Sequence, residues 1–128
     1  MVCDHPPAII RVVDDVGGVV TDYLARAGLY RACGDRVVFS GACRSSCTVY
    51  LSVPGSCATR SAVFGFHAPY WPGRQGGVTD ATLEATARAM LASYPNPLRL
   101  WLGNRLTVGM RYLGAAGAAK LGAVRLCQ

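Results

Sequence analysis

Short apolar runs rich in β-branched residues alternate with segments of helical periodicity along this chain, and that alternation most constrains its fold. Strands are expected at 8–13, 36–40, 62–66 and 123–126. Helices are expected at 19–33, 45–51, 79–93, around 98–102 and at 114–121, while 70–77 has the composition of a loop. The sequence therefore predicts an α/β fold with a mostly parallel sheet flanked by helices, in a single domain that spans 1–128.

The composition narrows the classes of partner. Hydrophobic residues make up 52% of the chain and charged residues only 16%, which provides a sizeable core and excludes a disordered chain. The net charge of +6 comes almost entirely from arginine. The arginines are scattered from Arg11 to Arg125 without a run, so we interpret them as a solubilising surface and expect no nucleic-acid partner. No stretch reaches about 18 uninterrupted apolar residues, so we expect no transmembrane helix and no membrane partner.

Six cysteines in 128 residues allow two interpretations, a disulfide framework in an oxidising compartment or a metal site. The closest pair, Cys43 and Cys47, lacks the C-x2-C spacing of zinc sites, and the other four are spread along the chain, which favours disulfides. Disulfides place the protein in the periplasm or outside the cell. Because residues 1–5 show neither a basic nor an apolar signal-peptide region, we expect that a targeting segment has been removed.

The expected positions of the cysteines suggest how they pair. Cys47 follows a helix start, and Cys57 lies where the chain returns to the sheet after the Pro54-Gly55 turn. The chain can therefore double back and join them. A cysteine before the first strand and one at the end of the following helix should meet at the amino edge of the sheet. The last two cysteines then remain for each other. The expected pairs are, in that order, Cys47–Cys57, Cys3–Cys33 and Cys43–Cys127.

Three strand ends carry residues suited to chemistry. Gly17-Gly18 follows the first strand, segment 41–47 carries Ser45 and Ser46 into a helix, and His67 ends the third strand. The carboxyl ends of parallel strands share one edge of a sheet, where ligands bind. Glycines can present backbone N–H groups, a serine at a helix start lies near free N–H groups, and a histidine can accept its proton. Each feature also has an ordinary role, as a turn, a helix cap or a hydrogen-bonded histidine.

Segments 12–19, 38–46 and 63–69 resemble, in the same order, three elements of the proteolytic subunit of Clp protease. In that family a strand leads into a Gly-Gly turn, the next strand ends in a Gly-x-Ala-Ala-Ser nucleophile turn, and a third ends in the catalytic histidine followed by a proline-containing loop. The chain also resembles small secreted bacterial proteins that share a G-x-C-x-S-x-C segment and a following F-H. The resemblance implies a Clp-protease/crotonase-type fold.

The resemblance also implies roles for four residues. Ser45 takes the position of the nucleophile and His67 that of the general base. The backbone N–H groups of Gly18 and Ser46 take the position of the oxyanion hole. Related folds assemble as trimers or hexamers, so a homo-oligomer is expected.

The acid that completes a catalytic triad is missing from its expected place. Aligning the C-terminal region with the family puts Met110 at the acid position, and no Asp or Glu follows Glu84. The carboxylates that remain as substitutes are Asp14, Asp15 and Asp80. Loss of the orienting acid costs about four orders of magnitude in rate.

Three functions remain open on the sequence. The first is a secreted serine hydrolase that cleaves peptide or acyl bonds with a Ser45–His67 dyad, on a substrate that the sequence does not specify. The second is a catalytically degenerate binding or assembly module that kept the fold and lost the acid. Neither function needs a cofactor. The third is a metal site, whose ligands would be Cys43, Cys47, Cys57 and His67.

Overall fold

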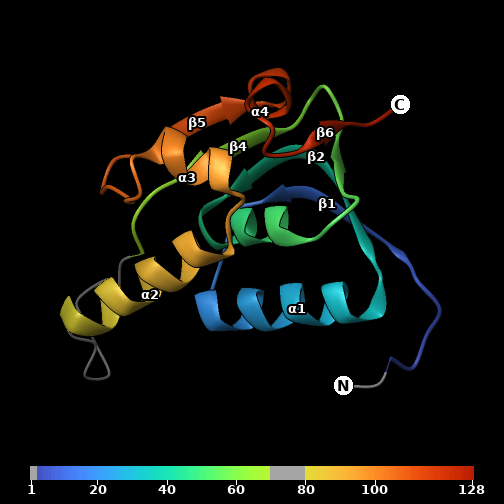
Figure 1. Ribbon diagram of the computed structural model, residues 1–128, viewed down its shortest axis with the longest axis horizontal. Helices are drawn as coiled ribbons and strands as arrows, with labels where there is room; N and C mark the ends of the chain where they lie inside the picture. Colours follow the sequence, from blue (N-terminus) through green and yellow to red (C-terminus); the bar gives the residue numbers. More distant parts are fainter. Residues whose placement is uncertain (1–2, 70–79) are drawn as a thin grey trace.

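The computed structural model describes residues 3–69 and 80–128. Its strands are β1 (Ile9–Asp15), β2 (Arg36–Arg44), β3 (Cys57–Ala58), β4 (Val63–Phe66), β5 (Arg111–Gly114) and β6 (Arg125–Leu126) (Figure 1). Its helices are α1 (Val20–Cys33), the 3-10 helix η1 (Ser45–Ser52), α2 (Asp80–Ser93), α3 (Asn96–Leu102) and α4 (Ala115–Leu121). Within the described ranges, none of the helices is long and apolar enough to cross a membrane.

β2 is the central strand of a six-stranded sheet. β1 pairs with one edge of β2, while β3 and β4 pair with successive parts of its other edge, all in parallel. β6 pairs in parallel with β3, whereas β5 pairs antiparallel with β4. The protein is therefore a small α/β domain with a curled, mixed sheet.

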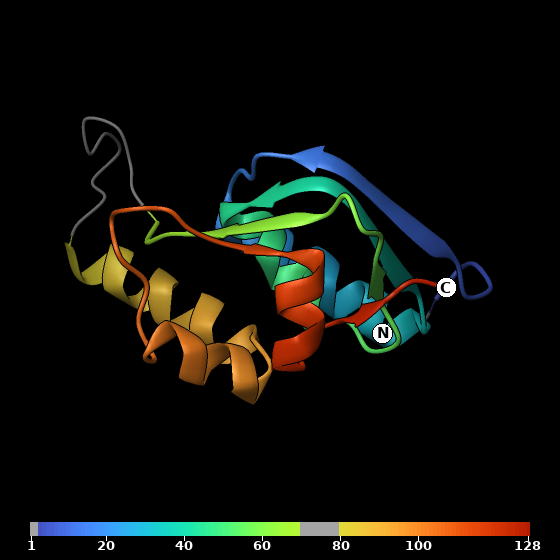
Figure 2. The same ribbon diagram turned by 90° about the horizontal axis from the view of Figure 1, so that it is seen from above.

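The helices lie against one face of this sheet (Figure 2). Successive side chains of a strand point to opposite faces, and on β2 this alternation buries Val37 and Phe39 completely. On the opposite face, Val13 of β1 and Tyr112 of β5 keep 65% and 53% of their surface exposed. Among the described residues, that face of the sheet is open to solvent.

Aromatic contacts fix the end of β4. The rings of Phe39 and Phe64 pack edge to face at 5.1 Å, and Phe66 packs in the same way on Tyr94 at 5.6 Å. Such pairs contribute roughly 0.5–1.5 kcal/mol beyond the area they bury. Because Phe66 directly precedes His67, this packing sets the position from which the histidine leaves the sheet.

Several elements differ from the sequence expectations. β3 and β5 were not expected: β3 has only two residues, and the RYLG sequence of β5 lacks a β-branched run. The segment from Ser45 forms a 3-10 helix rather than an α-helix. β2 continues to Arg44, four residues beyond the expected strand end. The loop expected at 70–77 lies outside the described residues.

All six cysteines are paired in disulfides, a pattern that fits an oxidising compartment. The expected pairs Cys47–Cys57 and Cys43–Cys127 were wrong. Cys57 lies on β3, which pairs with β6, and β6 ends directly before Cys127. β2 runs directly into η1, which brings Cys43 close to Cys47. The thiolate metal site expected as an alternative is also excluded, since three of its four ligands are oxidised. The disulfides are Cys3–Cys33, Cys43–Cys47 and Cys57–Cys127.

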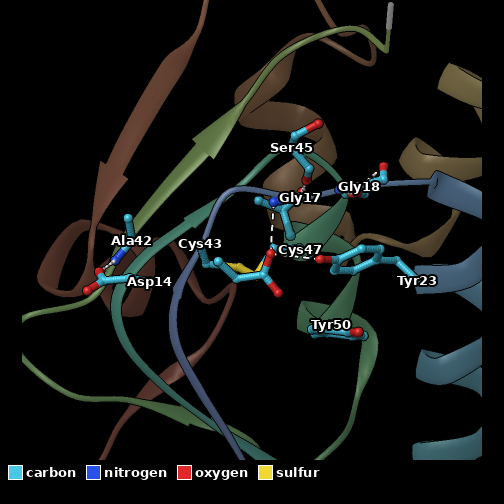
Figure 3. Close-up of a disulfide and its surroundings, with 12 residues drawn as sticks. Asp14, Gly17, Gly18, Tyr23, Ala42, Cys43, Ser45, Cys47 and Tyr50 are labelled. Atoms are coloured by element: carbon cyan, nitrogen blue, oxygen red, sulfur yellow. Dashed lines mark hydrogen bonds between the residues drawn. A yellow bond between two sulfur atoms is a disulfide. The ribbon is translucent and has the colours of Figure 1, made fainter. Parts of the chain in front are cut away.

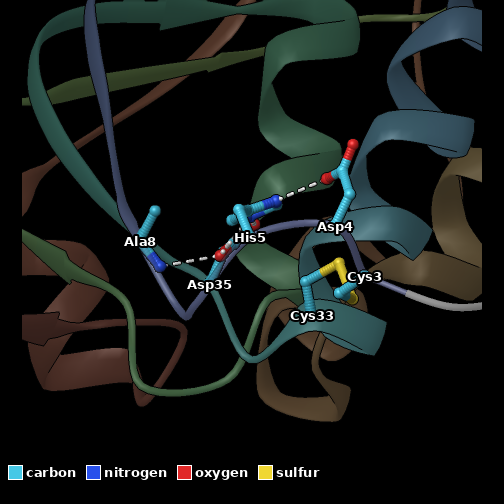
Figure 4. A network of polar contacts seen from close by, with 6 residues as sticks. All are labelled: Cys3, Asp4, His5, Ala8, Cys33 and Asp35. Carbon is cyan, nitrogen blue, oxygen red and sulfur yellow. Dashed lines mark hydrogen bonds and ion pairs between the residues drawn. A yellow bond between two sulfur atoms is a disulfide. The ribbon is translucent and has the colours of Figure 1, made fainter.

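The segment before β1 is held by the buried carboxylate of Asp35 (Figure 4). Asp35 accepts the backbone N–H of Ala8 at 2.8 Å and lies 3.1 Å from Nε2 of His5. The other ring nitrogen of His5 lies 3.1 Å from Asp4. The hydrogen bonds to Asp4 and then to Asp35 raise the pKa of His5. The Cys3–Cys33 disulfide anchors the same segment.

We expect His5 to stabilise the fold more at acidic than at alkaline pH. Its pKa is higher in the folded than in the unfolded chain, so its contribution is fully present below the unfolded value of about 6.5 and is lost as the pH rises through the folded value. Thermal unfolding of the wild type and of His5→Gln at about pH 5.5 and about pH 8.5 measures this. The difference between the two proteins should shrink at the higher pH, and an equal difference at both would contradict the assignment.

Candidate functional site

The three strand ends singled out in the sequence meet around one open cleft. The cleft has a volume of about 340 Å³ and lies at the carboxyl end of β1, β2 and β4. The parallel pairing of β2 with β1 and β4 explains the convergence, because it brings these three ends to one edge of the sheet. The described residues that line the cleft are Val16, Gly17, Gly18, Val20, Ser45, His67 and Pro69.

Ser45 occupies a sharp turn between β2 and η1 (Figure 3). Its φ of 57° is left-handed, whereas Arg44 before it is extended. A non-glycine residue in this region costs about 1–3 kcal/mol and persists only where its surroundings enforce it. Here the Cys43–Cys47 disulfide closes a short loop around Ser45 and holds the turn.

Gly17 packs directly on this turn. Its φ is 92°, and a Cβ atom at Gly17 would lie 2.9 Å from the carbonyl oxygen of Arg44 and 3.0 Å from Cβ of Ser45. Only glycine allows both this backbone conformation and this approach. The Gly-Gly turn after β1 therefore forms the wall that faces the serine.

Replacing Gly17 by alanine should destabilise the fold by about 1–3 kcal/mol, because the added methyl group meets backbone and because the left-handed φ disfavours alanine. Gly28→Ala is the matched control. Gly28 lies inside α1, where a Cβ would meet only ordinary contacts, so alanine should stabilise by about 0.5–1 kcal/mol. Urea unfolding measures both. A neutral Gly17→Ala variant would contradict the packing described here.

Ser46 locks the Gly-Gly turn to η1. Its side chain is fully buried, and its Oγ accepts the N–H of Gly18 at 2.7 Å while donating to the Gly18 carbonyl at 3.0 Å. The Gly18 N–H, expected in an oxyanion hole, is thus engaged within the protein. The N–H of Ser46 lies in the first turn of η1, where a helix offers no internal acceptor. The buried Ser46 hydroxyl was not foreseen from the sequence.

A hydrogen bond to the adjacent backbone sets the tautomer of the neutral His67 ring. Nδ1 lies 2.6 Å from the carbonyl oxygen of Ala68. A carbonyl only accepts hydrogen bonds, so Nδ1 carries the proton and, in the neutral ring, Nε2 presents its lone pair. The ring is therefore in the tautomer that a general base requires.

The neighbourhood of His67 contains a methionine where the family resemblance puts an acid. A second hollow of about 340 Å³ is lined by His67, Ala68, Pro69, Val108 and Met110. Met110 brings no charge to this place. Among the described residues, neither this hollow nor the cleft at Ser45 has a carboxylate in its lining.

Two of the substitute carboxylates hold backbone turns instead. Asp15 Oδ1 accepts the N–H of Gly17 at 2.8 Å and the hydroxyl of Tyr23 at 2.7 Å. Burial, and then this hydrogen bond, raises the pKa of Tyr23 to about 12, so its phenol stays protonated at neutral pH. Asp14 accepts the N–H of Ala42 at 2.8 Å (Figure 3). The third candidate, Asp80, begins α2.

A chain of buried hydroxyl groups supports the serine turn, and no pattern in the sequence indicates it. Thr48 Oγ1 donates to the Ser45 carbonyl at 2.6 Å. Its single proton is then used, so the hydroxyl of Tyr94, 2.6 Å away, is the donor to Thr48. Burial raises the pKa of Tyr94, which keeps that proton in place. Nothing in the sequence distinguishes Tyr94 from an ordinary core residue, because it simply follows the end of an amphipathic helix.

One group of potential metal ligands exists among the described residues. A ring nitrogen of His5, Sγ of Cys33 and a carboxylate oxygen of Asp35 lie within 4.8 Å of one another. Cys33 is bonded to Cys3, however, so its sulfur is not a thiolate. The remaining two residues form the ion pair that holds the N-terminal segment.

A scan against protein-family models gave no match to this sequence, and a search of curated proteins gave none. Its fold, in contrast, is similar to solved structures. A protein described only as an enzyme matches with a TM-score of 0.70 at 9% identity, over 96% of this chain and 79% of the other. A peptidase from Plasmodium falciparum matches with a TM-score of 0.63 at 9% identity, over the same shares. At such identities the likeness establishes a shared fold, and the function has to be argued from the site.

Proposed function

We propose that this protein is a periplasmic or secreted serine hydrolase that cleaves peptide or acyl bonds, with Ser45 as nucleophile and His67 as general base. The observation that carries the proposal is the left-handed Ser45 at the turn from β2 to η1, in the lining of the same cleft as His67. A serine in such a turn presents its hydroxyl group clear of the sheet. The fold shared with a peptidase adds support, and the disulfides favour an extracytoplasmic location.

The proposed reaction follows the chemistry of these groups. Ser45 Oγ attacks the substrate carbonyl carbon while its proton passes to Nε2 of His67. The negative charge that forms on the carbonyl oxygen is stabilised by the N–H of Ser46. His67 then returns the proton to the leaving group, and water hydrolyses the acyl-enzyme. The carbonyl of Ala68, which accepts the hydrogen bond from Nδ1, orients the imidazole for this transfer.

The Gly18 N–H joins the oxyanion hole in this proposal only after a rearrangement. Ser46 Oγ now accepts that N–H, so the Ser46 side chain has to rotate before the N–H can reach a substrate oxygen. A substrate that supplies a better acceptor would drive this exchange. The hole is thus half formed before the substrate binds.

A second candidate is a non-catalytic binding or assembly module, including one that assembles with copies of itself. Two observations favour it: the lining around His67 contains Met110 and no carboxylate among the described residues, and the Gly18 N–H is already satisfied. In such a module the cleft would hold a ligand or a neighbouring chain without cleaving it.

A fluorophosphonate probe, which reacts with activated serines, distinguishes the two candidates. The wild type should be labelled, Ser45→Ala should not, and His67→Gln should be labelled much more slowly. Ser61→Ala is the control, because Ser61 is an exposed serine outside the cleft. Intact mass spectrometry counts the label. An unlabelled wild type would favour the binding module, and labelling that survives in Ser45→Ala would overturn the assignment of the nucleophile.

A further inference from the structure

The open face of the sheet carries a groove that the proposed hydrolase does not use. It has a volume of about 390 Å³ and crosses β1, β2, β3 and β6 near the start of β2, away from the cleft that follows the end of that strand. Its described lining contains three arginines. They are far apart in the sequence, so the sequence did not indicate that they line one groove. The described lining of the groove includes Ile9, Arg11, Arg36, Val38, Cys57 and Arg125.

Strand register brings the arginines together. Arg11 pairs with Val38, Val38 with Cys57, and Cys57 with Arg125, so one row across four strands has an arginine at each end. Paired residues on adjacent strands point to the same face. Arg36 lies two residues before Val38 and therefore shares this face.

Gly55 links two of the arginines at one side of the groove. Arg125 donates to the Gly55 carbonyl at 3.3 Å. The side chain of Arg36 passes so close that a Cβ at Gly55 would lie 3.1 Å from its Cδ. The side chains of Arg36 and Arg125 thus both lie against the backbone at Gly55.

The three arginines have no acidic partner within the described ranges. The ion pairs of that part of the chain involve other residues, and no carboxylate side chain lines the groove. Like charges brought together on a sheet repel one another. An anionic ligand would relieve this repulsion, and a guanidinium group can bind a carboxylate through two parallel hydrogen bonds.

We propose that this groove binds an extended acidic peptide segment. Between the arginines its surface is aliphatic, with Ile9 and Val38, which suits apolar side chains of a peptide. Among the described residues, no aromatic ring lines it, so it lacks the stacking platform that single-stranded nucleic acids use. The row from Arg11 to Arg125 spans three strand spacings, about 14 Å, which matches about four residues of extended chain. Alternate side chains of an extended chain face the same side, so the fitting segment carries carboxylates about four residues apart and an apolar residue midway between them.

Fluorescence anisotropy with a labelled peptide, Glu-Thr-Val-Thr-Glu flanked by glycines, tests this proposal. The wild type should bind this peptide more tightly than its Gln-Thr-Val-Thr-Gln analogue, and higher salt should weaken the binding. Arg11→Gln/Arg125→Gln should lose affinity by about tenfold or more. Arg88→Gln/Arg105→Gln is the control: it removes the same charge outside the groove and should stay within about twofold of the wild type.

Several outcomes would overturn the acidic-peptide groove. They are equal binding of the two peptides, an equal loss in the two double variants, or no binding of the glutamate peptide. An oligonucleotide that binds more tightly than the peptide and depends on Arg11 and Arg125 would overturn the choice of a peptide. Circular dichroism confirms that both variants are folded. Because the readout is binding at a groove separate from Ser45, it is independent of whether the protein is a hydrolase.

Discussion

Replacing both Cys57 and Cys127 by alanine should lower the free energy of unfolding by about 4 kcal/mol. The bridge joins residues that are 70 positions apart, and a cross-link over that distance strongly restricts the unfolded chain. It also ties β6 to β3, which are each only two residues long. Urea unfolding of the oxidised protein measures the loss.

The Cys43→Ala/Cys47→Ala variant provides the matched control for this prediction. It makes the same change of side chains, but its bridge spans only 4 positions, so the loss should be about 2 kcal/mol. Equal losses in the two double variants would show that loop length does not explain the stabilisation.

The same Cys43→Ala/Cys47→Ala variant should have its largest effect on the reactivity of Ser45. Without the bridge, the turn at Ser45 can relax from its left-handed conformation, which is less favourable by about 1–3 kcal/mol. We expect the rate of labelling by the fluorophosphonate probe to fall by about tenfold or more, because misplacement of a reacting atom is costly. Labelling rates below the unfolding transition of each variant measure this.

The two double variants should therefore separate stability from reactivity. Cys57→Ala/Cys127→Ala should keep most of the labelling rate of the wild type while losing more stability, since its bridge lies at the other end of β2. If Cys43→Ala/Cys47→Ala is labelled as fast as the wild type, the bridge does not hold the serine turn. This outcome would leave the assignment of Ser45 to the separate test with Ser45→Ala.

The elements with strong local signals could be predicted from the sequence. β1 has a β-branched run, α1 has helical periodicity and β4 has an apolar run. The burial of β1 was not predictable in the same way, because Val12 is its one buried residue. β3 and β5 depend on tertiary pairing: β3 forms because β2 and β6 flank it, and β5 because β4 offers an antiparallel edge. Two of the disulfides were placed wrongly for the same reason, since their geometry depends on β3 and on the abrupt start of η1.

The site was predictable in outline only. Parallel pairing brings strand ends to one edge, so the convergence of Gly17, Ser45 and His67 on one cleft follows from their places in the sequence. The hydrogen bond between Gly18 and Ser46 was not predictable, because it depends on side-chain direction. The Tyr94–Thr48 contact joins residues 46 positions apart, and no local pattern indicates it.

The final strand, β6, brings Cys127 to Cys57, and the long separation of these two cysteines in the sequence affects how the disulfides form after synthesis. Cys3 and Cys33 lie in the first third of the chain, and Cys43 and Cys47 are nearly adjacent, so both bridges can form while the rest is still emerging. Cys57 has to wait for its partner 70 residues later. During that wait it is a thiol that can attack either earlier bridge through thiol–disulfide exchange. We therefore expect that refolding of the reduced chain without a disulfide isomerase accumulates mispaired forms.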